Sequence, residues 1–328
     1  MLITVAICTW NRSKLLDATL LEMEKLRIPA GVTWELLVVD NNSKDDTAAV
    51  IQRHTAKGIL PIRGLFEPKP GHSNARNCAM AAARGELVIW TDDDVLVDAD
   101  WIEAYYAAVS RYPDAAFFGG TVDPLYEVEP TSWMRKHRQL VEGPFALRQL
   151  GPEVRPLVGK ELPFGANMAL RWNGGGEALF DPKLGRQGNI LISGDETAVF
   201  ESLRQQGKIG IWVGNARVRH FIPKERINIG YIWKFWAGIG ATNMRRHGLP
   251  EAAYFLGMPR WMIRKYVGLR LGALVRTPVK NAKWADLFKD SADIYGAMCE
   301  ARKMGRSKPE MKTAVAAQPV PVREGAGG

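Results

Sequence analysis

The sequence predicts an α/β protein with a mainly parallel central sheet flanked by helices. Over the first 120 residues, apolar runs typical of buried strands alternate with helical patterns, as expected for βαβ units. Polar clusters follow three of these runs, where a parallel sheet commonly binds a ligand. Apolar residues make up 46% of the 328 residues, enough for a sizeable core.

The elements follow in order from the N-terminus. Strands are predicted at residues 2–8, 34–39, 60–66, 86–91 and 209–213. Helices are predicted at residues 14–26, in a segment ending near 54, at 72–84 and at 195–206. Ser13 is the expected N-cap of the first helix, because its hydroxyl can accept a free backbone N–H. Residues 124–163 show weak periodicity and are expected to pass over the sheet as a long segment that forms one wall of a binding site.

Three adjacent carboxylates, Asp92, Asp93 and Asp94, follow the strand predicted at 86–91. Such a cluster repels itself unless a cation joins it, and Mg²⁺ and Mn²⁺ favour carboxylate oxygens together with substrate phosphates. The alternative is an acidic turn that caps a helix starting near Ala99.

The first two predicted strands also end in polar residues, at 9–12 and 40–43. Asp40 can accept hydrogen bonds from a base or ribose, and a local Asx-type turn is the alternative. All three clusters are expected along one edge of the sheet. The first strand is not followed by G-x-G-x-x-G or by a P-loop, which excludes both phosphate-binding fingerprints.

Asp195 and Glu196 lie at a predicted helix N-terminus, where acids also occur simply because the helix dipole favours them. The functional interpretation makes one of them a general base for an acceptor hydroxyl. His220 follows a strand-like run and is either a third metal ligand, a phosphate contact or a structural histidine.

Five segments, taken together and in order, resemble the family 2 glycosyltransferases, the large inverting group with a GT-A fold. The resemblance runs from Val5 to about Pro223 and rests on VAICTWNRSKLL, LLVVDNNSKDDT, GHSNARNCAMAAARGELVIWTDDD, FGANMALRW and GDETAVFESLRQQGKIGIWVGNARVRH. The third of these segments leads into what looks like the family's D-x-D motif.

The resemblance implies a role for each matching residue. Asp40 would contact the nucleobase, Arg76 the base or diphosphate, and Asp92 and Asp93 the ribose and metal. Asp94 would be the direct metal ligand, with Asp92 and His220 beside it. Glu196 occupies the catalytic position, but the family usually has Glu-Asp where this chain has Asp195-Glu196, so Asp195 stays an alternative base. The other expected donor contacts are Thr9, Asn11, Arg12 and Asn42.

The implied activity is inverting, Mg²⁺- or Mn²⁺-dependent transfer of a sugar from a nucleotide-diphosphate sugar to an acceptor hydroxyl. A UDP-sugar is the first expectation, with GDP and dTDP donors open, and the acceptor would be a saccharide or lipid-linked saccharide in polysaccharide or glycolipid assembly. A nucleotidyltransferase and a non-catalytic protein that binds an anionic polymer are the alternatives. Nucleic acid is not an expected partner.

We expect three parts in the chain: residues 1–223 as the catalytic domain, with a donor half to about 122 and an acceptor half from about 123, residues 224–313 as a basic, aromatic helical extension, and residues 314–328 as a disordered tail. From Arg217 to Lys283 there are fourteen Lys or Arg residues and two acids, a net charge of +12. Aromatic residues such as Trp233, Trp236 and Trp261 lie among these cations, a mixture that suits an anionic membrane interface. A solvated basic face or a helical lid is the alternative.

The expected location of the protein is the cytoplasm. Any attachment to the inner face of the membrane would be peripheral. The N-terminus lacks a basic leader with a long apolar core. The most apolar C-terminal stretch is interrupted by five Lys or Arg residues, so no transmembrane helix is predicted. Three scattered cysteines are too few for a disulfide framework.

Overall fold

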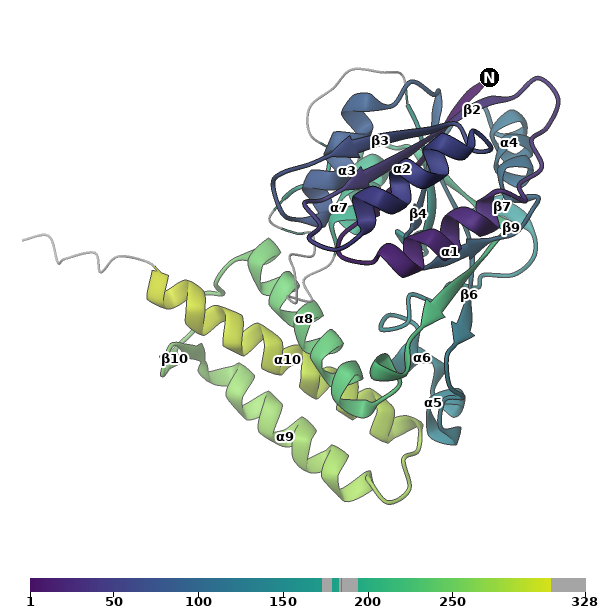
Figure 1. Ribbon diagram of the computed structural model, residues 1–328. Coiled ribbons are helices and arrows are strands. Elements are labelled where there is room, and N and C mark those ends of the chain that lie inside the picture. The colour runs from purple at the N-terminus through teal and green to yellow at the C-terminus, as the bar shows by residue number, and fades with distance from the viewer. Residues whose placement is uncertain (173–178, 183, 185–193, 308–328) are drawn as a thin grey trace, which may run out of the picture.

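The computed structural model describes residues 1–172, 179–182, 184 and 194–307. Figure 1 shows a sheet flanked by helices, with three long helices packed together beside it. The tail expected at 314–328 lies outside the described residues. The predicted α/β class with helices around a central sheet is confirmed.

The described strands form a nine-stranded sheet in the order β3-β2-β1-β4-β8-β6-β9-β5, with β7 paired to β9. The strands are β1 (Leu2–Thr9), β2 (Thr33–Asp40), β3 (Ile62–Phe66), β4 (Leu87–Asp92), β5 (Val95–Val97), β6 (Ala115–Tyr126), β7 (Val154–Pro156), β8 (Asn167–Arg171) and β9 (Ile209–Ile222). The helices around it are α1 (Ser13–Met23), α2 (Thr47–Lys57), α3 (His72–Ala82), α4 (Trp101–Arg111), α5 (Ser132–Lys136), α6 (Arg138–Val141) and α7 (Asp195–Gln205).

The N-terminal half of the sheet, β3-β2-β1-β4, is entirely parallel, as the sequence predicts. Its register sets the site, because Thr9 pairs with Asp40 and Cys8 with Asp92. The carboxyl ends of three strands therefore finish level with one another. Polar residues that follow those ends are brought to one edge of the sheet.

The second half of the sheet mixes directions. β6 and β9 are parallel to each other, whereas β8 runs antiparallel to both β4 and β6. The sequence predicts neither β6 nor β8, and it ends the last strand at residue 213 although β9 continues to Ile222. Gly, Pro or charged residues interrupt the apolar pattern of β6 and β9, and β8 is only five residues long. All three strands are held by pairing on both sides instead.

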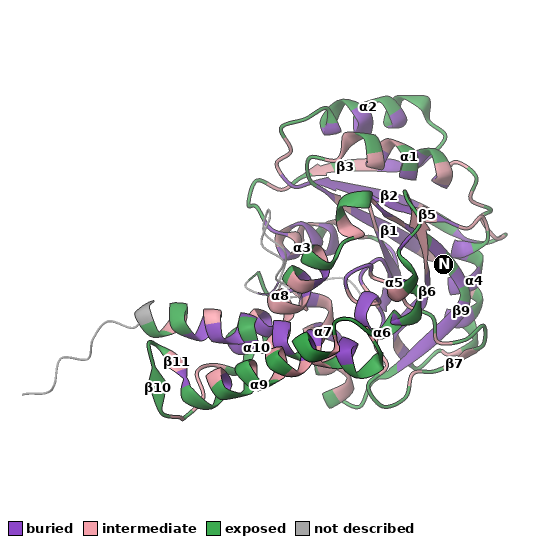
Figure 2. Ribbon diagram, turned by 90° about the horizontal axis from the view of Figure 1, so that it is seen from below, coloured by how far each residue is buried: buried purple, intermediate pink, exposed green. Residues whose placement is uncertain are grey.

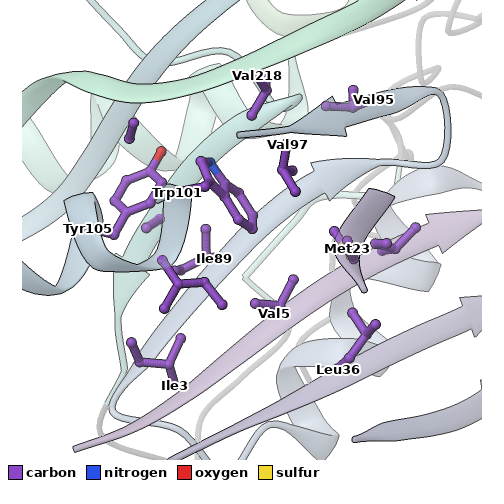
Figure 3. Packing of buried hydrophobic residues seen from close by; sticks show 14 of the residues in the cluster. Ile3, Val5, Met23, Leu36, Ile89, Val95, Val97, Trp101, Tyr105 and Val218 are labelled. Carbon is purple, nitrogen blue, oxygen red and sulfur yellow. The ribbon is translucent and has the colours of Figure 1, made fainter. Parts of the chain in front are cut away.

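Two apolar layers cover the sheet, one on each face. Ile3, Val5 and Ile89 point into the layer beneath α1, α2 and α4, which Figure 3 shows together with Trp101 and Tyr105. The intervening Ala6 and Val88 point into the opposite layer, against α3 and α7. This two-residue alternation is what a sheet buried on both faces requires.

The first helix begins differently from the expectation. Ser13 is its first helical residue rather than its N-cap, and the N-cap position is taken by Arg12, whose side chain makes no capping bond. The free backbone N–H of Ser13 donates instead to Asp45 Oδ2 at 2.9 Å. The N-cap prediction was wrong because a carboxylate 32 residues away supplies the acceptor, and Arg12 is thereby left for the site.

Asn167 at the start of β8 is a buried polar hub that joins β6, β9 and α4. Its side-chain N–H groups donate to the carbonyls of Thr121 at 2.9 Å and Ala216 at 2.8 Å. Its Oδ1 accepts from Trp101 Nε1 at 2.9 Å and Tyr105 Oη at 2.7 Å. All four partners are buried, so each depends on Asn167 for a hydrogen bond that water does not replace.

The C-terminal helices are α8 (Ile229–His247), α9 (Arg260–Arg276) and α10 (Ala282–Ser307), with a small hairpin of β10 (Tyr254–Phe255) and β11 (Met258–Pro259) before α9. α8 and α10 cross at close range, because a Cβ on Gly240 would lie 1.8 Å from the Asp293 carbonyl and one on Gly296 would lie 1.7 Å from the Ala237 carbonyl. Trp236 Nε1 donates to the Leu140 carbonyl at 2.9 Å and ties the bundle to α6. In the described residues, no helix combines the length and the apolar character needed to cross a bilayer.

Replacing Asn167 with Leu is expected to lower the free energy of unfolding by about 3 kcal/mol or more, because up to four buried polar groups lose their partner at about 1–3 kcal/mol each. Urea unfolding followed by circular dichroism measures the change. Asn243→Ala, at an exposed position on α8, is the matched control and should change stability little. Equal losses in the two variants would contradict the hub role.

Candidate functional site

The site lies at the shared carboxyl edge of β1, β2 and β4. The loop after β1 carries Arg12, the end of β4 carries the three aspartates, and β9 brings His220 against β5, where it pairs with Val95. The sequence predicts Arg12 and the three aspartates along one edge, and the structure adds His220 to them.

Asp93 and Asp94 are two adjacent buried carboxylates held by a shared cation. Arg12 Nη1 donates to Asp93 Oδ1 at 2.8 Å and to Asp94 Oδ2 at 2.9 Å. Thr9 Oγ1 donates to Asp93 Oδ2 at 2.8 Å. Burial raises the pKa of Asp93 to about 6, although Arg12 opposes the rise. Thr9 and Arg12 thus contact the acid cluster itself, whereas the sequence assigned them to the donor.

Asp94 lies at the centre of a group that fits a divalent cation. Asp92, Asp94 and His220 each offer one ligand atom, and these atoms lie within 4.8 Å of one another. Asp94 Oδ1 is a buried oxygen without a hydrogen-bond partner, although His220 Nε2 lies 3.2 Å away. Two carboxylates and one imidazole are a suitable donor set for Mn²⁺ or Mg²⁺ when substrate oxygens complete it.

Arg226 also reaches Asp94, and sequence reasoning missed it. It lies in the short 3₁₀ helix η1 (Lys224–Arg226), with Nη2 3.5 Å from Asp94 Oδ2 and Nη1 3.5 Å from His220 Nε2. Burial opposes ionisation of Asp94, but His220, Arg12 and Arg226 together hold its pKa well below the usual range. The signal in the sequence was the spacing of six residues from His220, which the surrounding basic composition concealed.

A second cluster joins α3 to the N-terminus of α7. Arg76 Nη1 donates to Asp195 Oδ2 at 2.9 Å and lies 3.4 Å from Glu196 Oε2. Ser73 Oγ lies 3.3 Å from the same oxygen of Asp195. The side chains of Arg76 and Asp195 are each 3% exposed, whereas that of Glu196 is 19% exposed. The charge of Asp92 acts on Arg76, so the two clusters are electrostatic neighbours.

The two acids of α7 differ in ionisation. Burial opposes ionisation of Asp195, but the Arg76 guanidinium holds its pKa well below the usual range. Burial raises the pKa of Glu196 to about 7, and the neighbouring Asp195 carboxylate adds to the rise. One acid is therefore a fixed anion, and the other exchanges its proton near neutral pH.

The position of Arg76 depends on a glycine before β8. A Cβ on Gly165 would lie 2.2 Å from Arg76 Nη2, so only glycine leaves room for the guanidinium there. The Arg76 guanidinium also lies over the ring of Phe180, whose centroid is 5.3 Å from Cζ. Sequence reasoning included Gly165 in a resembling segment without a role, because this contact links residues far apart in the chain.

Asp40, Asn11 and Asn42 organise the loops beside the cluster. Asp40 Oδ1 accepts the backbone N–H of Ser43 at 2.8 Å, which is a local turn contact of the kind weighed as the alternative. Asn11 Oδ1 accepts the backbone N–H of Lys44 at 2.6 Å and joins the loops after β1 and β2. Asn11 and Asn42 have positive φ angles of 53° and 65°, which asparagine tolerates better than most residues.

The raised pKa of Glu196 predicts how stability changes with pH. Between pH 4.5 and about 7 the unfolded chain loses this proton while the folded chain keeps it, so this group's stabilising contribution is present below pH 4.5 and falls as pH rises to about 7. The contribution is at most about 3 kcal/mol. Urea unfolding at several pH values, with EDTA present, should show a smaller decline over this window in Glu196→Gln than in the unaltered protein. Identical profiles would contradict the assigned protonation.

Comparison with known proteins agrees with the fold and with the family that the motifs resemble. The family model described as Glycosyl transferase family 2 matches residues 4–165. The succinoglycan biosynthesis protein ExoM of Rhizobium meliloti (strain 1021) is 24% identical over 258 residues, which cover 76% of this chain and 78% of that protein.

Two solved structures share the fold at low sequence identity. A crystal structure of residues 1–349 of TarS from S. aureus has a TM-score of 0.50 at 14% identity, covering 93% of this chain and 91% of that one. GalNAc-T7, crystallised with UDP, GalNAc and Mn²⁺, has a TM-score of 0.50 at 15% identity, covering 75% of this chain and 50% of that one. Residues 4–165 therefore belong to the glycosyl transferase family 2, and the chain has a GT-A fold.

Proposed function

We propose that the protein transfers a sugar from a nucleotide-diphosphate sugar to an acceptor hydroxyl, with inversion and with the help of Mn²⁺ or Mg²⁺. The observation that carries the proposal is a pair of neighbouring sites. One is the group of Asp92, Asp94 and His220 at the sheet edge, and the other is the Arg76–Asp195–Glu196 cluster between α3 and α7. The first fits the metal and diphosphate of a donor, and the second supplies an acid–base group for an acceptor.

On the donor side, we assign cation binding to Asp92, Asp94 and His220. A divalent cation held there supplies positive charge for the departing diphosphate. Arg226 would lose its pairing with Asp94 when that carboxylate binds a cation, and its guanidinium is then able to pair with a phosphate oxygen. Arg12 positions Asp93 and opposes the rise in its pKa that burial causes.

On the acceptor side, Glu196 is the proposed general base and Asp195 the residue that positions it through Arg76. A base works best when its pKa lies near the working pH, which favours Glu196 over the permanently ionised Asp195. The greater exposure of Glu196 also lets an acceptor hydroxyl reach it. Removal of the hydroxyl proton as the oxygen attacks the anomeric carbon needs no covalent sugar–enzyme intermediate.

The substrates follow from relatives and remain part of the proposal. ExoM is named for succinoglycan biosynthesis, and TarS for poly(ribitol-phosphate) β-N-acetylglucosaminyl transfer. GalNAc-T7 was crystallised with UDP, and for this chain we propose a UDP-sugar donor and a saccharide or lipid-linked saccharide acceptor. Residues 1–223 would form the catalytic domain and residues 224–313 an extension that positions the acceptor. Family membership favours this transfer over a nucleotidyltransferase or a non-catalytic polymer-binding protein.

Exchange of Glu196 for Gln is expected to lower kcat by about 10² or more, because general-base catalysis contributes typically 10²–10⁴-fold. In the unaltered enzyme, kcat should rise with pH to a plateau above about 7, since the base must be ionised. Initial rates of nucleotide release with acceptor present measure both. If Asp195→Asn removes the pH dependence while Glu196→Gln keeps it, the roles of the two acids are reversed.

Mn²⁺ together with UDP is expected to raise the melting temperature by about 5 °C at a hundredfold excess over Kd. Asp94→Ala should lose the response to Mn²⁺, because it removes the central ligand. Arg226→Gln should keep the Mn²⁺ response but bind UDP about tenfold or more weakly, as expected for a lost charged hydrogen bond. Asp290→Ala, an exposed acid on α10, is the control. No response of the unaltered protein to any metal or nucleotide would overturn the proposed function.

A further inference from the structure

We propose that the outward face of α9 binds an anionic membrane surface. The inference goes beyond the transferase activity and does not depend on it. The occupant is a bilayer whose lipids carry negative headgroups, and the binding elements are exposed apolar side chains flanked by cations.

Exposed apolar side chains are concentrated in one short stretch of the chain. Among the described residues, nine of the eighteen exposed large apolar side chains lie between Tyr254 and Val279. They are Tyr254, Phe255, Leu256, Trp261, Val267, Leu271, Leu274, Val275 and Val279. Singly scattered exposed residues need no explanation, but this concentration in one segment indicates an interaction surface. Figure 2 shows α9 and the β10–β11 hairpin at the outer edge of the helical bundle, with exposed residues along them.

α9 carries two apolar stripes rather than one. Met262, Tyr266, Leu269 and Ala273 follow one another at helical spacing and pack against the bundle. Val267, Leu271, Leu274 and Val275 also follow helical spacing, i, i+4, i+7 and i+8, but all are exposed, Val275 by 77%. A helix that packs on one side only needs one stripe. The second therefore meets something outside the described chain.

The positive charge near the second stripe favours an anionic partner. From Arg260 to Lys283 there are seven Lys or Arg residues and no acid. Arg264 and Lys265 are exposed at the N-terminal end of α9, next to the exposed Trp261. Cations beside apolar and aromatic side chains match a bilayer interface. There the lipid phosphates pair with the cations, and the boundary of the acyl chains contacts the apolar side chains. Arg260 and Arg264 are exposed and precede Val267 and Leu271 at helical spacing, so two copies of this face would bring like charges together and self-association is disfavoured.

A groove beside the proposed membrane-binding face of α9 lies close in the chain to the candidate active site. A groove of about 330 Å³ lies between α8, α9 and α10 and is lined by Ile229, Trp233, Arg270, Leu274 and Phe288 among others. Ile229 follows Arg226 by three residues, and Arg226 contacts Asp94. If the protein docks through α9, only a few residues of chain would therefore separate the candidate site from the bundle that faces the membrane.

The test is flotation of the full chain with vesicles of phosphatidylcholine containing about a third phosphatidylglycerol, against phosphatidylcholine alone. The unaltered protein should bind the anionic vesicles at low salt. The triple variant Val267→Asp/Leu271→Asp/Val275→Asp should lose binding. Its matched control, Ile59→Asp/Val128→Asp/Val158→Asp, carries the same charge change at exposed apolar positions outside the patch and should still bind. Equal losses in both triple variants would overturn the proposal.

A second pair of measurements separates charge from self-association. Arg264→Gln/Lys265→Gln should weaken partitioning on the order of twentyfold, since each cation near an anionic surface contributes about fivefold. Sedimentation of the unaltered protein should show a monomer without vesicles. A dimer that the α9 triple variant abolishes, with no vesicle binding by the unaltered protein, would show that a second copy covers this face and would overturn the membrane assignment. Circular dichroism confirms that each variant is folded.

Discussion

Burial of two adjacent carboxylates is the constraint around which the site is built. Asp93 and Asp94 lie at the end of β4 with almost no exposure, and like charges so placed are unfavourable unless cations compensate them. The compensating cations come from two separate segments, Arg12 after β1 and Arg226 in η1, and the His220 imidazole on β9 lies 3.2 Å from Asp94. The loops at the sheet edge and the start of the helical bundle must therefore converge on one pair of residues.

The same electrostatic logic distinguishes the two acids of α7. Asp195 takes the close contact with Arg76, whereas burial and the neighbouring Asp195 carboxylate raise the pKa of Glu196 to about 7. Two neighbouring carboxyl groups with pKa values pushed apart are a common basis for dividing structural and acid–base roles. Gly165 contributes only by having no side chain, yet the contact between Arg76 and Asp195 depends on the space it leaves.

The helical bundle uses its aromatic residues in two ways. Phe235 is buried, Trp233 and Trp236 are partly buried, and all three pack inside the bundle or against α6, so the part of α8 that suggested a membrane interface is mainly structural. Trp261 and the outer stripe of α9 are exposed instead. Composition alone did not separate these groups, because both are aromatic or apolar residues among cations.

The sequence by itself determined the α/β class, the parallel strands β1 to β4, and the convergence of Asp40, Asp92 and Asp94 on one edge. These features follow from local periodicity and from the geometry that every parallel sheet shares. Only the tertiary structure decided that the Asp45 carboxylate accepts the first free backbone N–H of α1 and that β9 runs to Ile222. It also decided that Arg226 and Gly165 lie at the candidate site. Arg12 and Asp93 are 81 residues apart, and Arg76 and Asp195 are 119 apart. Pairing over such separations depends on which segments the fold brings together, and no local pattern in the chain records it.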